Sequence, residues 1–465
     1  MNILIKNGIL VDSESTHKGE ILVCGEKINA AADKIDVSMI PENTRIIDAQ
    51  GLIVLPGLID AHTHYHLVSR GTVTADSFPE GSRLAAFGGV TTVIDFADHD
   101  KSGTLLESAE KRKSAMEQGM SIDFTLHQSV YEMHNGLPAQ LKELKAAGVR
   151  TIKIFTTYKD VGYLIENDGL RDLFAACRDL EMMVTVHAED NDLIEQLLDE
   201  HGDRPFTPAS HAMLRPVEAE EHAIRYVGGL AEELDMPIYI VHLSSKAGLQ
   251  AIQELRVRGV QITAETTPHY LQLTRELLDR EDAPLYIMTP PLRTSEDNTA
   301  LWNGVVHGAI SIIATDHCSF TREQKLSSHD CRTIYPGIPG TEELLPLIHT
   351  FGVQRGLISM ERLVSLLSTN PAKTFGLYPR KGCLLVGSDA DITLFDPNVT
   401  WTITNETQHT AAGYTPFDGT KVVGKAVMTM RRGEILCEGD TYYGKSGTGM
   451  FIAADRPGIF HHYKD

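Results

Sequence analysis

The stretch Pro56-Gly57-Leu58-Ile59-Asp60-Ala61-His62-Thr63-His64 decides both the fold and the chemistry that we expect of this chain. An apolar run from Leu52 to Ile59 leads into two histidines that stand two residues apart. In an extended backbone, residues i and i+2 point to the same side. His62 and His64 can therefore aim both imidazoles at one point just beyond a buried strand, which suits a metal ion. The pair alone is equally well explained by two unrelated histidines at a strand end, so the choice between these explanations depends on residues elsewhere in the sequence.

Strand-like and amphipathic stretches alternate from this run onwards. The β-rich runs cover residues 53–59, 91–96, 124–130, 151–156, 183–187, 238–242, 262–266 and 311–315. Stretches with helical spacing lie between them, such as residues 137–147, 169–180, 219–234 and 246–258. This alternation predicts an α/β fold of the (β/α)8 type, a TIM barrel. A doubly wound sheet is the alternative, but it usually has about six strands, so eight favour the barrel.

Both ends of the chain differ from the middle in their hydrophobic pattern. Residues 1–52 form short apolar or alternating runs, punctuated by turn signals such as Asn7-Gly8. Residues 377–440 again lose the helical period. We expect residues 1–52 and 377–440 to form one smaller β-sandwich beside a barrel of residues 53–376. Residues 441–465 are rich in Gly, Tyr and charge and are expected to form an irregular tail.

Polar residues stand at the C-terminal ends of the predicted strands, where barrel enzymes keep their chemistry. A lone histidine on an apolar strand is usually a core residue. Five strands that bring histidine, lysine or aspartate to one rim are not expected by chance. The candidates are His62, His64, Lys153, His187, His242 and Asp316.

Lys153 lies inside an apolar run and needs an explanation of its own. A buried ammonium must lose its charge or find a partner, and an ammonium cannot ligate a cation. Addition of CO₂ to the neutral amine gives a carbamate, which resembles a carboxylate and could bridge two metal ions. The alternative is a lysine that is paired with an acid at a strand end.

Composition excludes several classes of partner. The 465 residues carry a formal net charge of −21, which argues against nucleic acid and against an anionic membrane surface. The six cysteines include no C-x-x-C pair, which argues against a disulfide framework and favours a cytoplasmic protein. The N-terminus turns polar within a few residues and no apolar run approaches membrane-spanning length. We therefore expect neither a signal peptide nor a membrane span.

The chain resembles the cyclic amidohydrolases of the dihydropyrimidinase and D-hydantoinase family almost from end to end. The matching stretches are residues 56–64, GTVTADSF at 71–78, KIFTTYK at 153–159, HAE at 187–189, TPPLR at 289–293 and GLYPRKG at 376–382. The resemblance implies a zinc-type binuclear centre in a barrel, a β-sandwich formed by both chain ends, and usually a homotetramer.

Site residues follow from the same resemblance. The metal ligands would be His62, His64, carbamylated Lys153, His187, His242 and Asp316. Two divalent ions, most simply Zn²⁺, would be bridged by the carbamate of Lys153 and by a hydroxide that attacks a ring carbonyl. Asp316 would act as general base and then acid. Tyr158 would donate a hydrogen bond to the oxyanion, and backbone groups near Thr289 and Pro336 would pair with the ring amides.

The activity implied is metal-dependent hydrolysis of a dihydropyrimidine or a 5-substituted hydantoin to an N-carbamoyl amino acid. An allantoinase is one alternative, because His269 stands where hydantoinases tend to have glutamine and allantoinases histidine. A non-catalytic, assembly-forming relative is a remote alternative, because such relatives lack several of the ligands present here.

Two further departures concern the substrate. Pro336 replaces an asparagine of the family pattern; proline keeps the carbonyl acceptor but has no N–H. Gly162 replaces a bulky aromatic residue, and we expect Gly162, Tyr65 and His66 to shape the pocket for the group outside the ring.

Overall fold

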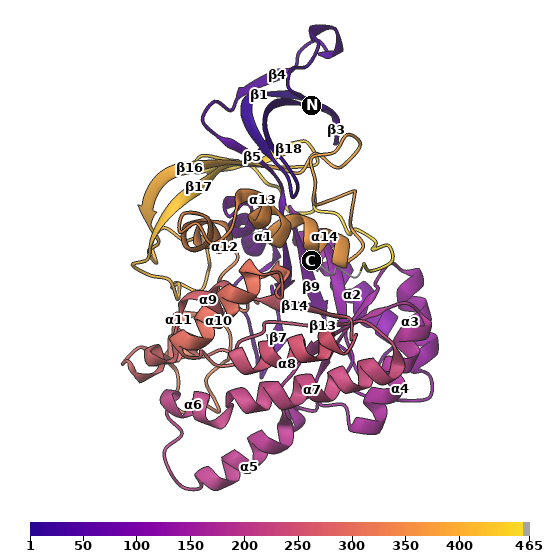
Figure 1. The fold of residues 1–465 in the computed structure, drawn as a ribbon, viewed down its shortest axis with the longest axis vertical. Coiled ribbons are helices and arrows are strands. Elements are labelled where there is room, and N and C mark those ends of the chain that lie inside the picture. Colours follow the sequence, from indigo (N-terminus) through magenta and orange to yellow (C-terminus); the bar gives the residue numbers. More distant parts are fainter. Residues whose placement is uncertain (459–465) are drawn as a thin grey trace.

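Two β-sheets organise the chain in the computed structural model, which describes residues 1–458. One is a parallel sheet of eight strands that curls into a barrel with helices around it (Figure 1). The other is a separate sheet built from both ends of the chain. The predicted fold class, a TIM barrel with a smaller β domain, is confirmed. Of the expected tail at residues 441–465, the part from 459 to 465 lies outside the described residues.

The barrel strands run parallel to their neighbours and are buried on both faces, because helices cover their outer side. In sheet order they are β6 (Leu58–Thr63), β9 (Val90–Ala97), β10 (Asp123–Ser129), β11 (Thr151–Phe155), β12 (Met183–His187), β13 (Ile238–Ile240), β14 (Ile262–Thr266) and β15 (Ile312–Ile313). The last strand returns to the first through a parallel bridge between Thr63 and His317. The Thr315 N–H also donates to Asp60 Oδ1 of β6 at 3.0 Å.

The helices alternate with these strands as the spacing predicted. Their bounds are α1 (Phe78–Phe87), α2 (Leu105–Gly119), α3 (Leu137–Ala146), α4 (Asn167–Asp179), α5 (Asn191–His201), α6 (Pro208–Leu214), α7 (Val217–Leu234), α8 (Lys246–Val257), α9 (Pro268–Gln272), α10 (Ser295–Val306), α11 (Arg322–Leu326), α12 (Leu344–Ile348), α13 (Met360–Val364) and α14 (Asn370–Thr374). Capping boxes begin α2, with Thr104 and Glu107, and α10, with Thr294 and Asp297. In Figure 1, α12, α13 and α14 lie between the barrel and the other sheet.

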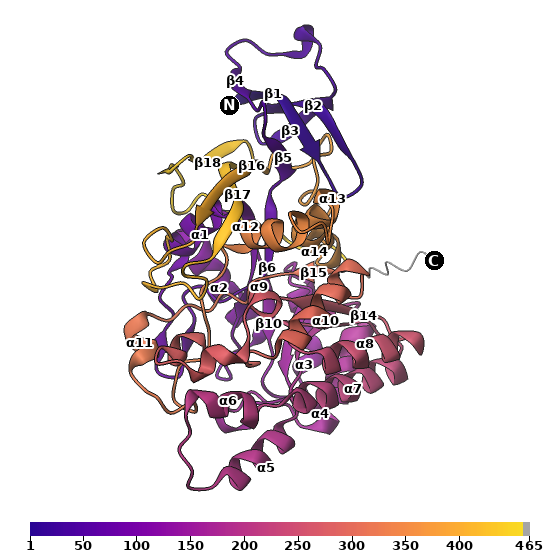
Figure 2. The ribbon, with the colours of Figure 1, turned by 60° about the vertical axis from the view of Figure 1, so that its left-hand side comes forward.

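The second sheet, here called the terminal sheet, joins the two chain ends. Its strands are β1 (Asn2–Val11), β2 (Thr16–Cys24), β3 (Lys27–Ala32), β4 (Arg45–Asp48), β5 (Ile53–Pro56), β16 (Ile392–Thr402), β17 (Lys421–Arg431), β18 (Glu434–Glu438) and β19 (Thr441–Tyr442). Strand β5 connects the halves, because it pairs with β1 on one side and with β16 on the other. Figure 2 shows this sheet at one end of the molecule, beyond the barrel.

The run from 53 to 59 was expected to be one barrel strand and is in fact two. Residues 53–56 belong to the terminal sheet as β5, and the barrel begins with β6 at Leu58. Gly57 makes the step between the sheets: its N–H donates to Asp391 O at 2.8 Å. A Cβ at this position would lie 2.2 Å from Thr91 Oγ1, so the backbone passes where no larger residue fits.

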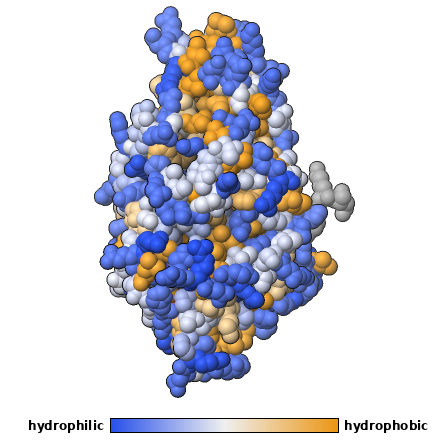
Figure 3. Space-filling model, turned by 90° about the vertical axis from the view of Figure 1, so that its left-hand side faces the viewer, coloured by the Kyte–Doolittle hydropathy of each residue, from blue (hydrophilic) through white to orange (hydrophobic). Residues whose placement is uncertain are grey.

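Hydrophobic side chains also reach the surface at the terminal-sheet end. Figure 3 shows them gathered on the upper part of one face. Exposed apolar residues in these segments include Val37, Ile46 and Val386. Among residues 1–458, no helix has the length and hydropathy that a membrane span requires.

Glu343, just before α12, should make the stability of the fold depend on pH. Burial raises the pKa of its carboxyl to about 7, while Thr415 donates a hydrogen bond to it at 2.6 Å. Between about pH 4.5 and 7 the folded chain holds a proton that the unfolded chain has lost, so this group lowers stability as pH rises through that window. We expect Glu343→Gln to stabilise the protein by up to about 3 kcal/mol at pH 8 and little at pH 4.5. Urea unfolding at the two pH values measures this, and an equal effect at both would contradict it.

Candidate active site

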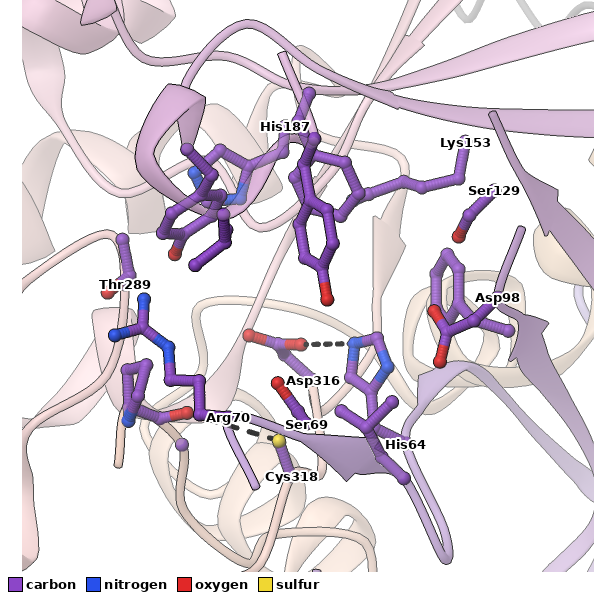
Figure 4. A pocket seen from close by; sticks show the side chains of 18 of the residues that line it. His64, Ser69, Arg70, Asp98, Ser129, Lys153, His187, Thr289, Asp316 and Cys318 are labelled. Carbon is purple, nitrogen blue, oxygen red and sulfur yellow. Dashed lines mark hydrogen bonds and ion pairs between the residues drawn. The ribbon is translucent and has the colours of Figure 1, made fainter. Parts of the chain in front are cut away.

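All nine residues expected at the site line a single cavity of about 420 Å³ at the C-terminal ends of the barrel strands. Figure 4 shows His64, Asp316, Lys153, His187 and Thr289 arranged around it. The nine are His62, His64, Lys153, Tyr158, His187, His242, Thr289, Asp316 and Pro336. Segments separated by more than 250 residues in sequence therefore meet in one place.

One corner of the cavity gathers two histidines around a carboxylate. Asp316 Oδ1 lies 3.1 Å from His62 Nε2 and 3.3 Å from His64 Nε2. One possible ligand atom from each of the three residues lies within 4.8 Å of the others. Burial alone would raise the pKa of Asp316, but the neighbouring imidazoles outweigh it and hold this pKa below its ordinary range. Asp316 therefore presents a carboxylate to the cavity.

Carboxylates behind the histidines fix which ring nitrogen faces the cavity. His62 Nδ1 lies 2.8 Å from Glu265 Oε1, and His187 Nε2 lies 2.7 Å from Glu189 Oε2. A carboxylate accepts the N–H of its imidazole, so the other nitrogen, His62 Nε2 or His187 Nδ1, keeps a lone pair. Arg215 Nη1 in turn donates to Glu189 Oε2 at 2.6 Å.

Sequence reasoning did not assign roles to these supporting groups. Glu189 and Glu265 stand at the ends of strands five and seven, beside residues that were singled out, so strand-end position was the available signal. Arg215 follows α6 and carries no such signal. Burial alone would raise the pKa of Glu189, but the guanidinium of Arg215 beside it outweighs burial and lowers this pKa to about 2. Glu189 is therefore an anion at neutral pH.

The donor set fits divalent metal ions such as zinc. Desolvation lowers the pKa values of His64, His187 and His242, so these imidazoles are neutral, as metal ligation requires. His187 Nδ1 faces His242 Nε2 at 2.9 Å. His242 Nδ1 is buried and has no hydrogen-bond partner within residues 1–458. Imidazole nitrogens and a carboxylate that converge in this way are ligands that zinc prefers.

Lys153 lies on β11 with its side chain buried in the wall of the cavity. Its Nζ lies 5.3 and 5.0 Å from the ring centroids of Phe96 and Phe155, and the described part of the chain gives it no hydrogen bond or ion pair. The alternative of a lysine paired with a strand-end acid is therefore not what the structure shows. Burial lowers the pKa of Lys153 to about 8, so about a tenth of the amine is neutral at pH 7.

Three of the nine residues expected at the site hold left-handed backbone conformations, which side-chain-bearing residues rarely adopt. They are Tyr158 (φ 65°), His242 (φ 36°) and Asp316 (φ 51°). Each such residue costs about 1–3 kcal/mol and tends to occur at functional sites. Packing also fixes the Tyr158 ring, which lies 5.0 Å from the Arg215 guanidinium and 5.3 Å from the His187 ring.

The loop after β6 does not shape the cavity through the residues expected. Tyr65 points into the core, where its hydroxyl donates to Thr341 Oγ1 at 3.2 Å, and His66 is exposed; neither lines the cavity. The backbone turns at His66 (φ 48°) into a short hairpin, β7 (Val68–Ser69) and β8 (Thr72–Val73). This hairpin brings Leu67, Ser69 and Arg70 over the cavity instead.

Comparison with known proteins shows the family of this chain. The family model described as the amidohydrolase family matches residues 53–436. The chain belongs to the amidohydrolase family. A D-hydantoinase of Ralstonia pickettii is 35% identical over 97% of this chain and 98% of its own length. A D-hydantoinase of Geobacillus stearothermophilus is also 35% identical, over 97% of this chain and 96% of its own.

The structure of this amidohydrolase is also similar to solved structures. The crystal structure of dihydropyrimidinase from Brevibacillus agri has a TM-score of 0.95 and 32% identity, and each chain is covered in full. This places the chain beside the dihydropyrimidinases and hydantoinases within the family. His269, the feature that favoured an allantoinase, is buried beside Tyr270 and is not among the residues that line the cavity.

Proposed function

We propose that this amidohydrolase opens the ring of a five- or six-membered cyclic diamide, a 5-substituted hydantoin or a dihydropyrimidine. Water adds to a ring carbonyl, the adjacent carbon–nitrogen bond breaks, and an N-carbamoyl amino acid results. The observation that carries the proposal is the single cavity in which His62, His64, Lys153, His187, His242 and Asp316 converge. The relatives named D-hydantoinase and dihydropyrimidinase, which match over nearly the whole chain, support the same substrate class.

The cofactor that we propose is a pair of Zn²⁺ ions, held by these six residues with Lys153 as its carbamate. Carbamylation joins CO₂ to the neutral amine and releases one proton. The lowered pKa and missing partners of Lys153 favour it, because both leave the amine reactive. Bound metal ions would supply an activated water and polarise the carbonyl that it attacks.

Side chains of the cavity would transfer the proton and stabilise the negative charge that develops on the carbonyl oxygen. Asp316 would take the proton of the attacking water and pass it to the leaving ring nitrogen. Burial raises the pKa of Tyr158, so its hydroxyl keeps its proton and can donate to the carbonyl oxygen as negative charge develops there. Pro336 offers a carbonyl acceptor for a ring N–H, and the backbone at Thr289 would hold the ring's other polar edge.

Turnover of three substrates by zinc-loaded protein in bicarbonate buffer tests the proposal. We expect hydrolysis of a 5-substituted hydantoin or of dihydrouracil, with allantoin much slower. Fastest turnover of allantoin would contradict the substrate class. The non-catalytic alternative predicts no turnover of any substrate and well under one metal ion per chain. The homotetramer implied by the resemblance stays a prediction.

Replacing Tyr158 by phenylalanine removes one hydroxyl and keeps the ring. We expect kcat to fall about 10²–10³-fold, with a smaller change in KM, because the hydrogen bond forms mainly in the transition state. Tyr163→Phe, which alters another tyrosine of the same cavity, is the matched control and should change kcat far less. Equal losses in the two variants would remove Tyr158 from the proposed role.

A further inference from the structure

The hairpin that covers the cavity carries an arginine, Arg70, that has no role in the proposed reaction. Arg70 stands at its tip, between β7 and β8, where the turn is made by left-handed backbone at Arg70 (φ 49°) and Gly71 (φ 77°). Its side chain lines the same cavity as the predicted metal ligands. In Figure 4 it reaches towards Thr289, on the opposite side of the cavity from Asp98. Its guanidinium carbon lies 5.9 Å from the centroid of the Tyr158 ring.

Arg70 has no ion pair or hydrogen bond within the described residues, whereas its neighbouring arginines are paired. Arg215 Nη1 donates to Glu189 at 2.6 Å, and Arg332 Nη2 donates to Asp330 at 2.6 Å. Asp98, an acid of the cavity wall, accepts a hydrogen bond from the Tyr131 hydroxyl at 2.7 Å and none from an arginine within residues 1–458. On a chain of net charge −21, an unpaired arginine at the cavity mouth is a local site for an anion.

Space for a ligand continues past Arg70. A second cavity of about 270 Å³ shares Arg70, Tyr158, Thr289 and Pro336 with the first. A group attached to a ring held at Thr289 and Pro336 can therefore extend beside Arg70. Two acids, Asp160 and Glu195, also line the second cavity, but neither forms an ion pair with Arg70.

From this arrangement we infer that Arg70 makes the enzyme prefer rings that carry a carboxylate on a short arm. This inference rests on the proposed function and narrows it to one substrate class. A planar guanidinium matches a carboxylate with two parallel N–H···O bonds. The apolar side chains of Leu67 and Val161, which also line the cavity, provide contacts for the methylene groups of the arm.

A matched pair of substrates tests the inference on zinc-loaded enzyme: 5-(2-carboxyethyl)hydantoin and its neutral amide, 5-(2-carbamoylethyl)hydantoin. The two arms have nearly the same shape and differ in charge. We expect wild type to favour the carboxylate, and Arg70→Gln to reduce the ratio of the two kcat/KM values about 10- to 100-fold. Arg70→Lys should keep part of the preference. Arg332→Gln, which removes the paired arginine of the second cavity, should leave the ratio unchanged.

Binding of the ring-opened compounds gives a readout that does not depend on turnover. Calorimetry with N-carbamoylglutamate and N-carbamoylglutamine should show the same preference and its loss in Arg70→Gln. If wild type hydrolyses the amide but does not favour the carboxylate, or if Arg70→Gln slows both equally, the inference is wrong while the proposed function stands. If wild type opens neither ring, nor any other hydantoin or dihydropyrimidine, the proposed function fails and this inference fails with it.

Discussion

Replacing Lys153 by alanine should abolish hydrolysis and remove most of the bound metal. The proposed carbamate would supply negative charge beside two bound cations, and without it their repulsion would be uncompensated. We expect kcat/KM to fall at least about 10³-fold and the metal content to drop to less than half that of wild type. Activity assays and elemental analysis of protein prepared with zinc and bicarbonate measure both.

Two further variants separate the carbamate from the lysine itself. Lys153→Glu places a carboxylate on a shorter arm and should retain more metal than Lys153→Ala. Lys159→Ala, an exposed lysine on the following loop, should behave as wild type. Full metal content and normal turnover in Lys153→Ala would refute the carbamate assignment.

Replacing Lys381 by methionine should lower the free energy of unfolding strongly, and far more than replacing a half-exposed lysine does. Its buried Nζ lies 2.6 Å from Asp123, 2.7 Å from Asp391 and 3.1 Å from Asp389. Burial disfavours its charge, but these carboxylates outweigh burial and raise the pKa of Lys381 above its ordinary value. Removing the cation leaves buried carboxylates without a positive partner, which should lower the free energy of unfolding by about 3–5 kcal/mol. We expect thermal unfolding to begin several degrees lower.

The cluster around Lys381 also offers a matched control. Lys27 Nζ lies 2.7 Å from Asp389, but half of its side chain is exposed. Lys27→Met should therefore cost no more than about 1 kcal/mol. Because Asp123 belongs to β10 of the barrel and Asp391 leads into β16, we attribute the larger effect of Lys381 to its place between the barrel and the terminal sheet. Equal losses in both variants would contradict that attribution.

The sequence predicted the parts of this molecule that repeat or that depend on local spacing. Eight apolar runs alternating with amphipathic stretches predicted the barrel, and strands β12 and β14 begin and end at the predicted residues. His62, in β6, and His64, directly after it, both face the cavity, as period-two geometry predicted. Asp316 could be placed near these histidines because barrel closure brings the last strand beside the first.

What the sequence could not predict depends on where the chain turns. The run from 53 to 59 has uniform apolar character, so nothing in its hydropathy marks the step between two sheets at Gly57. The side chains that cover the cavity depend on the bend at His66, which buries Tyr65 and presents Arg70. Glu189 and Glu265 are recognisable as partners of His187 and His62 only when the distances between neighbouring strands are known.

We expect five strands to bring their ends to one pair of metal ions, with carbamylated Lys153 between them. A crystal structure of the protein grown with zinc and bicarbonate, measured at the zinc absorption edge, tests it most directly. We expect two anomalous peaks in the cavity, flanked by His62, His64, His187, His242 and Asp316, and continuous density for a carbamate on Lys153. Peaks elsewhere in the molecule, or an unmodified Lys153 beside two bound ions, would contradict it.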